Sequence, residues 1–111
     1  MKTRPFRRGD LVTVSLSGEF GKPRPALIIQ SDVFAALPSI TVLSLTSDLY
    51  DAPNIRVTIQ PGEANGLQLP SQIMIDRAAT LRRDKVGKYI GHIDAEILDD
   101  VYEKLTRFLG K

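Results

Sequence analysis

One arginine of this chain stands between two prolines, directly before an apolar run. Arg24 follows Pro23 and precedes Pro25, and the run ALIIQ (26–30) is typical of a core strand. The prolines restrict the backbone beside the arginine, so less conformational entropy is lost when a ligand binds. A guanidinium stays charged at physiological pH and binds two phosphate oxygens at once. Arg24 is therefore a candidate for stabilising charge on a phosphate, and the alternative is a strand-edge residue that pairs with Glu19.

A hydroxyl follows the next apolar run. Thr46, in LSLTSD (43–48), stands where a strand is expected to give way to a loop, and its hydroxyl can donate to a phosphate oxygen. The same hydroxyl can instead accept a backbone N–H in an ST-turn, which the residues alone favour. Ser47 and Asp48 come next and are candidates for a supporting role.

The chemistry open to the chain is limited by its composition. The 111 residues include one histidine, His92, and no cysteine. A pair of histidines within one chain, a cysteine nucleophile and a cysteine-bearing metal site are therefore excluded. His92 precedes the last predicted helix, where a lone histidine is expected to pack or cap. The absence of cysteine suits a reducing cytoplasm, and we expect no membrane span and no exported leader.

Charge is divided unevenly along the chain, although the net charge is only +2. Basic residues gather in residues 1–25 and 77–88, whereas acidic residues crowd into 94–103. The basic members are Lys2, Arg4, Arg7, Arg8, Lys22, Arg24, Arg77, Arg82, Arg83, Lys85 and Lys88. Such a molecule can attract a polyanion at one region and repel it at another, although ordinary solvated faces explain the charges equally well.

Period-two and β-branched runs predict the elements that position these residues. We expect strands over 10–16, 26–30, 40–45, 54–60, 67–76 and 88–93, with Pro70 at an edge or bulge, and one or two helical turns after Ser31. From Asp94 the apolar spacing changes to that of an amphipathic helix, which Asp94 caps and Gly110 ends. The prediction is one domain over residues 1–111, mainly β with α+β composition: a small half-open barrel of five to seven antiparallel strands with a C-terminal helix.

Four segments in this order resemble the MazF/PemK toxins of bacterial toxin–antitoxin modules. They are RRGDLVTVSL (7–16), GKPRPALII (21–29), LSLTS (43–47) and PSQIMIDRAATLRRDKVGKYIGHID (70–94), and the resemblance covers residues 7 to 109. It implies a Src-homology-3-like barrel, a cytoplasmic homodimer held in check by a cognate antitoxin, and a metal-independent, cofactor-free endoribonuclease acting on single-stranded RNA.

The resemblance also implies roles for particular residues. It places Thr46 beside Arg24, and it matches Asp76 to an aspartate proposed as a base in some members. In those members an arginine stands two positions before the aspartate, where this chain has Met74. That difference favours an Asp76–Arg24 pair of structural character over a base role for Asp76.

Further residues are expected to bind the RNA. Phe20, in the loop SGEFGK (17–22), is the aromatic residue best placed to stack on a base or to lie over the barrel as a lid. Ser71 and Gln72 are candidates for reading base edges. The remaining RNA-binding candidates are Arg8, Lys22, Ser47 and Arg77.

Three other classes of protein stay open. A CcdB-like toxin of the same fold binds DNA gyrase without catalysis, but its helix ends in aromatic residues, whereas RFLGK (107–111) ends in glycine and lysine. A plain RNA-binding barrel needs stacking aromatics on strands, and aromatic residues make up only 6% of the chain. A metal nuclease is least favoured, because Asp48 and Asp51 have no histidine nearby in the sequence.

Overall fold

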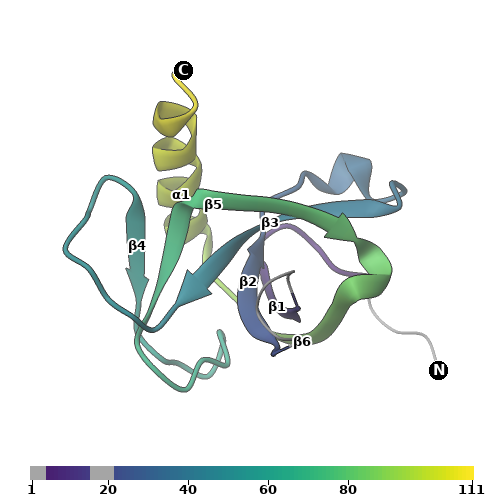
Figure 1. Ribbon diagram of the computed structural model, residues 1–111, viewed down its shortest axis with the longest axis horizontal. Helices are drawn as coiled ribbons and strands as arrows, with labels where there is room; N and C mark the ends of the chain where they lie inside the picture. The colour runs from purple at the N-terminus through teal and green to yellow at the C-terminus, as the bar shows by residue number, and fades with distance from the viewer. Residues whose placement is uncertain (1–4, 16–21) are drawn as a thin grey trace.

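A curved antiparallel sheet shapes the molecule. The computed structural model describes residues 5–15 and 22–111, in which six strands hydrogen-bond in the order β4-β5-β3-β2-β1-β6. The strands are β1 (Asp10–Val14), β2 (Arg24–Ile28), β3 (Ser39–Thr46), β4 (Arg56–Ile59), β5 (Ser71–Arg82) and β6 (Val86–His92). The sheet bends round without closing, and β5 arches across it (Figure 1). The predicted half-open, mainly β architecture is confirmed.

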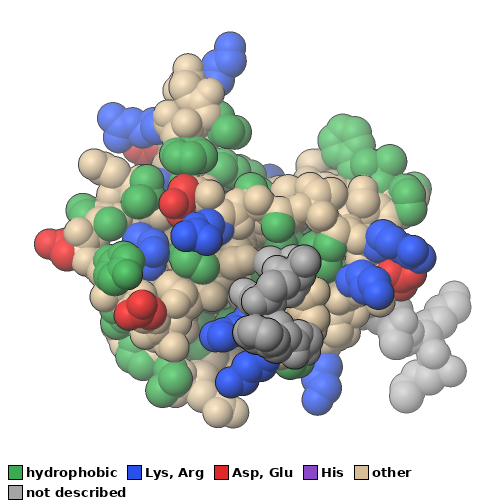
Figure 2. All heavy atoms as spheres, viewed as in Figure 1, with side chains coloured by type: hydrophobic (Ala, Val, Ile, Leu, Met, Phe, Trp, Pro, Cys, Tyr) green, Lys and Arg blue, Asp and Glu red, His purple; other side chains and the backbone are tan. Residues whose placement is uncertain are grey.

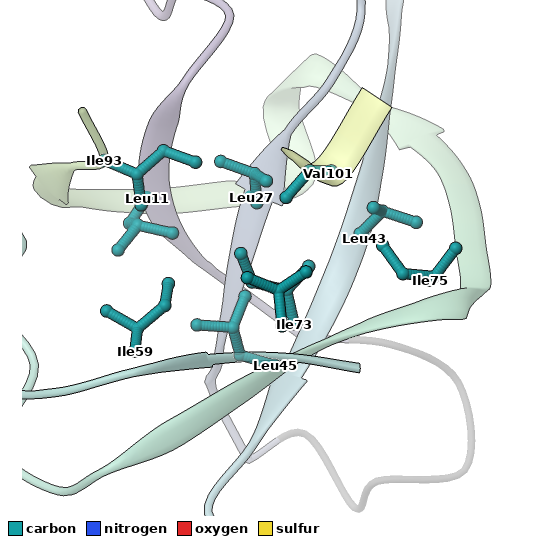
Figure 3. Close-up of a cluster of buried hydrophobic side chains, with 10 residues drawn as sticks. Leu11, Leu27, Leu43, Leu45, Ile59, Ile73, Ile75, Ile93 and Val101 are labelled. Atoms are coloured by element: carbon teal, nitrogen blue, oxygen red, sulfur yellow. The ribbon is translucent and has the colours of Figure 1, made fainter. Parts of the chain in front are cut away.

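The two faces of the sheet carry separate apolar cores, because successive strand residues point to opposite sides. One core lies between the sheet and helix α1 (Ala95–Phe108), and Figure 3 shows how its side chains converge. Its buried members are Leu11, Leu27, Leu43, Leu45, Val57, Ile59, Ile73, Ile75, Ile93 and Val101. The second core lies on the other face and consists of Val12, Val14, Ala26, Ile28, Ile40 and Val42. We call these the helix-side core and the inner core.

Helix α1 begins and ends as the sequence predicts. The Asp94 side chain accepts a hydrogen bond from the backbone N–H of Ile97 at 2.8 Å, which caps the first turn. At the other end Gly110 has a φ of 86°, a conformation that glycine adopts without strain. The apolar face buries Val101 in the helix-side core. In the described residues no helix is long and apolar enough to cross a membrane.

The short helical segment forms where it is expected, whereas the fifth strand differs from expectation. The segment after Ser31 forms one 3₁₀ turn, η1 (Asp32–Phe34), and the Ser31 hydroxyl accepts from the Val33 N–H at 3.2 Å as predicted. The strand expected over 67–76 instead runs from Ser71 to Arg82 and is followed by η2 (Arg83–Lys85). Pro70 has no N–H to donate and directly precedes the strand. Residues 77–82 extend it because they pair with β3.

Candidate active site

Arg24 and Thr46 come together at the end of the β2–β3 pair. The last backbone pair of that ladder is Ala26 with Ser44, and the same register carried two residues further sets Arg24 opposite Thr46. Directly opposed residues of an antiparallel pair point to the same face. Because Ala26 belongs to the inner core, Arg24 and Thr46 continue the inner face beyond the point where that core ends.

A pocket of about 170 Å³ opens where these strands end. Arg24, Thr46 and Ser47 line it together with the start of β5 and the segment that precedes it. The complete lining is Arg24, Pro25, Leu45, Thr46, Ser47, Leu67, Gln68, Leu69 and Ser71. Three of the polar residues expected to act on substrate, Thr46, Ser47 and Ser71, therefore share one pocket with Arg24.

The Thr46 hydroxyl has a defined orientation. Its oxygen accepts a hydrogen bond from the backbone N–H of Asp48 at 3.0 Å, which is the ST-turn that the residues alone favoured. A hydroxyl has two acceptor lone pairs and one proton, so this bond leaves the proton available to a ligand. The turn and the phosphate-binding role are therefore compatible.

Leu67, Gln68 and Leu69 form one wall of the pocket, and sequence reasoning missed them. The turn before them is held by Asn65, whose side-chain oxygen accepts from the N–H groups of Gly62 at 3.1 Å and Leu67 at 2.9 Å. The Asn65 amide nitrogen donates to the Gln60 carbonyl at 2.9 Å. The signal that could have drawn attention to the wall is the turn cluster PGEANG (61–66), but its approach to the pocket is a tertiary feature.

The Gln72 side chain is buried and hydrogen-bonded within the protein. It is only 5% exposed, and its side-chain oxygen accepts from the Tyr50 N–H at 3.0 Å and from Arg56 Nη1 at 3.1 Å. Its amide nitrogen donates to the Tyr50 carbonyl at 2.8 Å and to Thr58 Oγ1 at 3.2 Å. These bonds tie the loop between β3 and β4 to the sheet, and Gln72 does not line the pocket at Arg24.

Asp76 lies on the same face as Arg24 and Thr46 but outside the pocket lining. Ile73 and Ile75 point into the helix-side core, so alternation turns Asp76 to the opposite face. Strand β5 bulges here. Leu43 of β3 pairs with Ala78, but Leu45, two residues later, pairs with Ile73, which is five residues earlier in β5.

The carboxylate of Asp76 has an exposed neighbour. Asp76 Oδ2 lies 4.0 Å from Arg77 Nε, and the side chains of Asp76 and Arg77 are 33% and 68% exposed. The pair of Asp76 with Arg24 that the sequence favours stays a prediction.

Arg8 and His92 lie at the far end of β1 from Arg24. Val14 pairs with Arg24, whereas Asp10, at the other end of the strand, pairs with His92. Strand β1 spans roughly 13 Å between Asp10 and Val14, and Arg8 lies in the turn before Asp10. Within one chain, neither residue belongs to the pocket.

Arg8 instead joins β1 to helix α1. Its backbone N–H donates to Asp32 Oδ1 at 2.9 Å, and its guanidinium carbon lies 5.3 Å from the centre of the Tyr102 ring. The Tyr102 hydroxyl donates to the Ile29 carbonyl. Burial raises the pKa of Tyr102 above its ordinary value of 10.0, and the Arg8 charge offsets part of that rise.

Positive charge borders the pocket. Lys22 and Arg24 are both exposed, and Figure 2 shows several Lys and Arg side chains on the face in view. Phe20, Glu19 and the loop 17–21 lie outside the described residues. In the part of the chain that the structure describes, no cluster of three or more His, Asp or Glu residues could hold a metal ion.

Comparison with known proteins gives the context of this site. Residues 7–109 match the model of the PemK-like, MazF-like toxins of type II toxin–antitoxin systems. A probable endoribonuclease MazF from Mycolicibacterium smegmatis is 40% identical over 106 residues, covering 95% of this chain and 97% of that protein. Endoribonuclease EndoA from Bacillus subtilis is 28% identical over 104 residues, covering 89% and 90%.

Solved structures show the same fold. A mycobacterial endoribonuclease in complex with its cognate antitoxin superposes with a TM-score of 0.80 at 21% identity, covering 95% of each chain. The Mycobacterium tuberculosis toxin MazF-mt6 gives 0.77 at 24% identity, covering 90% of this chain and 95% of that one. The family match extends over nearly the whole sequence and includes both Arg24 and Thr46. This chain therefore belongs to the PemK-like, MazF-like toxins of type II toxin–antitoxin systems.

Proposed function

We propose that this toxin is an endoribonuclease that cleaves single-stranded RNA, with Arg24 and Thr46 acting on the scissile phosphate. The observation that carries the proposal is the meeting of Arg24 and Thr46 at adjoining strand ends, beside a pocket with polar and apolar walls. The relatives named as endoribonucleases support RNA cleavage over the CcdB-like binding of gyrase.

The reaction uses the nucleophile that RNA itself supplies. The 2′-oxygen attacks the adjacent phosphorus and loses its proton, the bond from phosphorus to the 5′-oxygen breaks, and that oxygen gains a proton. The products are a 2′,3′-cyclic phosphate and a free 5′-hydroxyl. This route needs no metal ion to generate the nucleophile, and DNA lacks the attacking group.

Arg24 and Thr46 stabilise the charge that grows on the phosphorus during this step. The Arg24 guanidinium binds two phosphate oxygens, and the Thr46 hydroxyl donates its remaining proton to one of them. The sheet already fixes both backbones, so binding orders only the two side chains.

Asp76 is the proton acceptor that we assign to the reaction. It lies on the inner face with Arg24 and Thr46, and a carboxylate in its ionised form can take the proton of the 2′-hydroxyl. Lys22 and Arg77 are both exposed and add positive charge for the neighbouring phosphates.

The biological setting follows from the family. A free ribonuclease of this kind would destroy cellular RNA, so a cognate antitoxin is expected to cover the site in the cytoplasm. A flexible acidic peptide can do so by imitating the phosphate chain. We also propose a homodimer. Arg8 lies far from the pocket of its own chain, and in the dimer Arg8 of the second copy adds positive charge beside that pocket.

The proposal is tested by incubating the purified protein with a mixed RNA pool in excess chelator and mapping the cut ends. We expect cleavage that gives 2′,3′-cyclic phosphate and 5′-hydroxyl ends. A substrate with 2′-deoxyribose at the scissile nucleotide should stay intact. Cleavage that chelator abolishes, or that cuts the deoxy substrate, would contradict the mechanism.

A further inference from the structure

We infer that the pocket beside Arg24 holds the base of a nucleotide next to the scissile phosphate, and that Gln68 selects that base through its side-chain amide. The inference rests on the proposed ribonuclease function and adds to it the residue that sets sequence preference. The pocket volume of about 170 Å³ lies below the roughly 300–1,000 Å³ of sites for drug-sized ligands, which suits one planar ring.

The position of the pocket determines which group can enter it. Arg24 and Thr46 both line it, so a phosphate held by these two side chains lies at its mouth. A base is joined to its phosphate through a single ribose, so the base beside the scissile phosphate is the part of the substrate within reach. The apolar lining of Pro25, Leu45 and Leu67 suits the ring faces of a base.

Gln68 supplies the polar contact that discrimination needs. Its side chain is exposed at the pocket, and none of the hydrogen bonds found among the described residues engages its amide. A glutamine amide presents one acceptor and two donor hydrogens, which matches the paired donors and acceptors of base edges. Gln72, near the start of β5, has its amide bound within the protein.

Leu69 is the third residue of the wall, and its apolar side chain is exposed. Its side chain is 59% exposed, although it lies next to a charged arginine in the pocket lining. The Ser71 hydroxyl donates to the Leu69 carbonyl at 2.9 Å, which fixes the backbone of the wall against the start of β5. An exposed leucine held in this way offers a contact for a base ring without having to be ordered first.

The wall is stiff because its preceding turn is locked against β6. Gly66 has a φ of 68°, and a Cβ at this position would lie 1.9 Å from the Ile90 carbonyl oxygen. A Cβ at Gly91 would lie 2.3 Å from the Asn65 carbonyl carbon, and the His92 N–H donates to the Ala64 carbonyl at 2.9 Å. Close backbone contact of this kind fixes the turn from which Gln68 extends, which helps to position a residue that reads a base edge.

The test compares wild type, Gln68→Ala, Gln68→Glu and the control Gln60→Ala in two random-sequence RNA pools. Gln60 is an exposed glutamine just before the same turn, and it does not line the pocket. One pool is unmodified and reports the bases that flank each cut. The other carries 2′-fluoro groups, cannot react, and is sequenced after capture on the protein.

We expect the wild type to prefer one base at a fixed position beside the cut, and the same base in the captured pool. Gln68→Ala should lower the frequency of that base relative to the others by roughly tenfold, while the RNA is still cut. Gln68→Glu should move the preference toward bases that present donors, and Gln60→Ala should match the wild type.

The other outcomes separate the two proposals. If RNA is cut and Gln68→Ala keeps the wild-type preference in both pools, the pocket assignment is overturned and the ribonuclease stands. If nothing is cut but the captured pool shows a preference that depends on Gln68, the pocket assignment stands and the ribonuclease proposal is overturned. Absence of both cutting and capture overturns both.

Discussion

Arg24 and Thr46 lie across from each other two residues beyond the last backbone pair of β2 and β3, Ala26 with Ser44. Each is also held from its other side, Arg24 by Val14 of β1 and Thr46 by Gln72 of β5. The two side chains therefore extend from neighbouring strands whose spacing is fixed by the sheet. This arrangement supports the proposed two-point contact of Arg24 and Thr46 with one phosphate.

Loss of the Thr46 hydroxyl should slow cleavage without unfolding the protein. Thr46→Val keeps the shape and removes the donor, and we expect the single-turnover rate to fall by roughly 10²-fold. Thr46→Ser retains the hydroxyl and should stay within a few-fold of wild type. Both should melt close to wild type, because the Asp48 N–H that loses its acceptor is at an exposed position. A Thr46→Val protein that cuts as fast as wild type would remove the hydroxyl from the mechanism.

Asp76→Asn should separate proton transfer from structure. The amide cannot take the proton of the 2′-hydroxyl, so we expect the cleavage rate to fall by about 10²-fold or more. The melting temperature should hardly change, because an exposed ion pair at 4.0 Å contributes little to stability. Asp84→Asn, at another exposed carboxylate beside an arginine, is the matched control and should leave the rate unchanged. Equal rates for the two variants would place the proton acceptor elsewhere.

Gly66→Ala should destabilise the fold by more than the strain of placing alanine at a positive φ. Gly66 and Gly9 both have positive φ, but a Cβ at Gly9 meets only Leu98 Cδ2 at 3.5 Å, whereas at Gly66 it overlaps the Ile90 carbonyl. Gly9→Ala should cost about 1–2 kcal/mol in the free energy of unfolding. Gly66→Ala should cost clearly more, and urea unfolding of both variants measures the difference. Equal losses would mean that the turn can move away from β6.

Ionisation of Tyr102 should lower the free energy of unfolding at alkaline pH. Its pKa is raised in the folded protein, so above pH 10 the unfolded chain loses the proton first and stability falls as pH rises. Tyr102→Phe should be less stable by about 1 kcal/mol at pH 8, because the bond to the Ile29 carbonyl is lost. The gap should narrow between pH 10 and 11 in denaturant titrations. A gap that stays constant over this range would contradict the assigned shift.

Local pattern was enough to predict the elements whose signals lie in neighbouring residues. The Asp94 cap, the period of helix α1 and the alternation of β1 all depend on local chemistry, and the structure contains each of them. The second half of β5 was missed because residues 77–82 have little apolar alternation and are strand only through pairing with β3. There the tertiary partner decides the conformation.

The candidate site divides in the same way. The family resemblance implied that Thr46 lies beside Arg24, and the apolar runs next to them located the strand ends at which both stand. Gln68 and Leu69 could not, because their place in the pocket depends on how the turn at Asn65 packs against β6. The hydrogen bonds of buried Gln72 could not be predicted either, because its partners are distant in the sequence.

The most direct test of the central claim is the single-turnover cleavage rate of Arg24→Lys in chelator, measured beside Arg24→Ala and the control Arg107→Ala. Arg107 is an exposed arginine near the end of helix α1 and does not line the pocket at Arg24. Lysine keeps the charge and loses the planar fork, so both substitutions at Arg24 should lower the rate by roughly 10²-fold or more while the folded proteins melt near wild type. Arg107→Ala should cut at the wild-type rate. Cleavage by Arg24→Ala within a few-fold of wild type would contradict the assignment of Arg24 to the scissile phosphate.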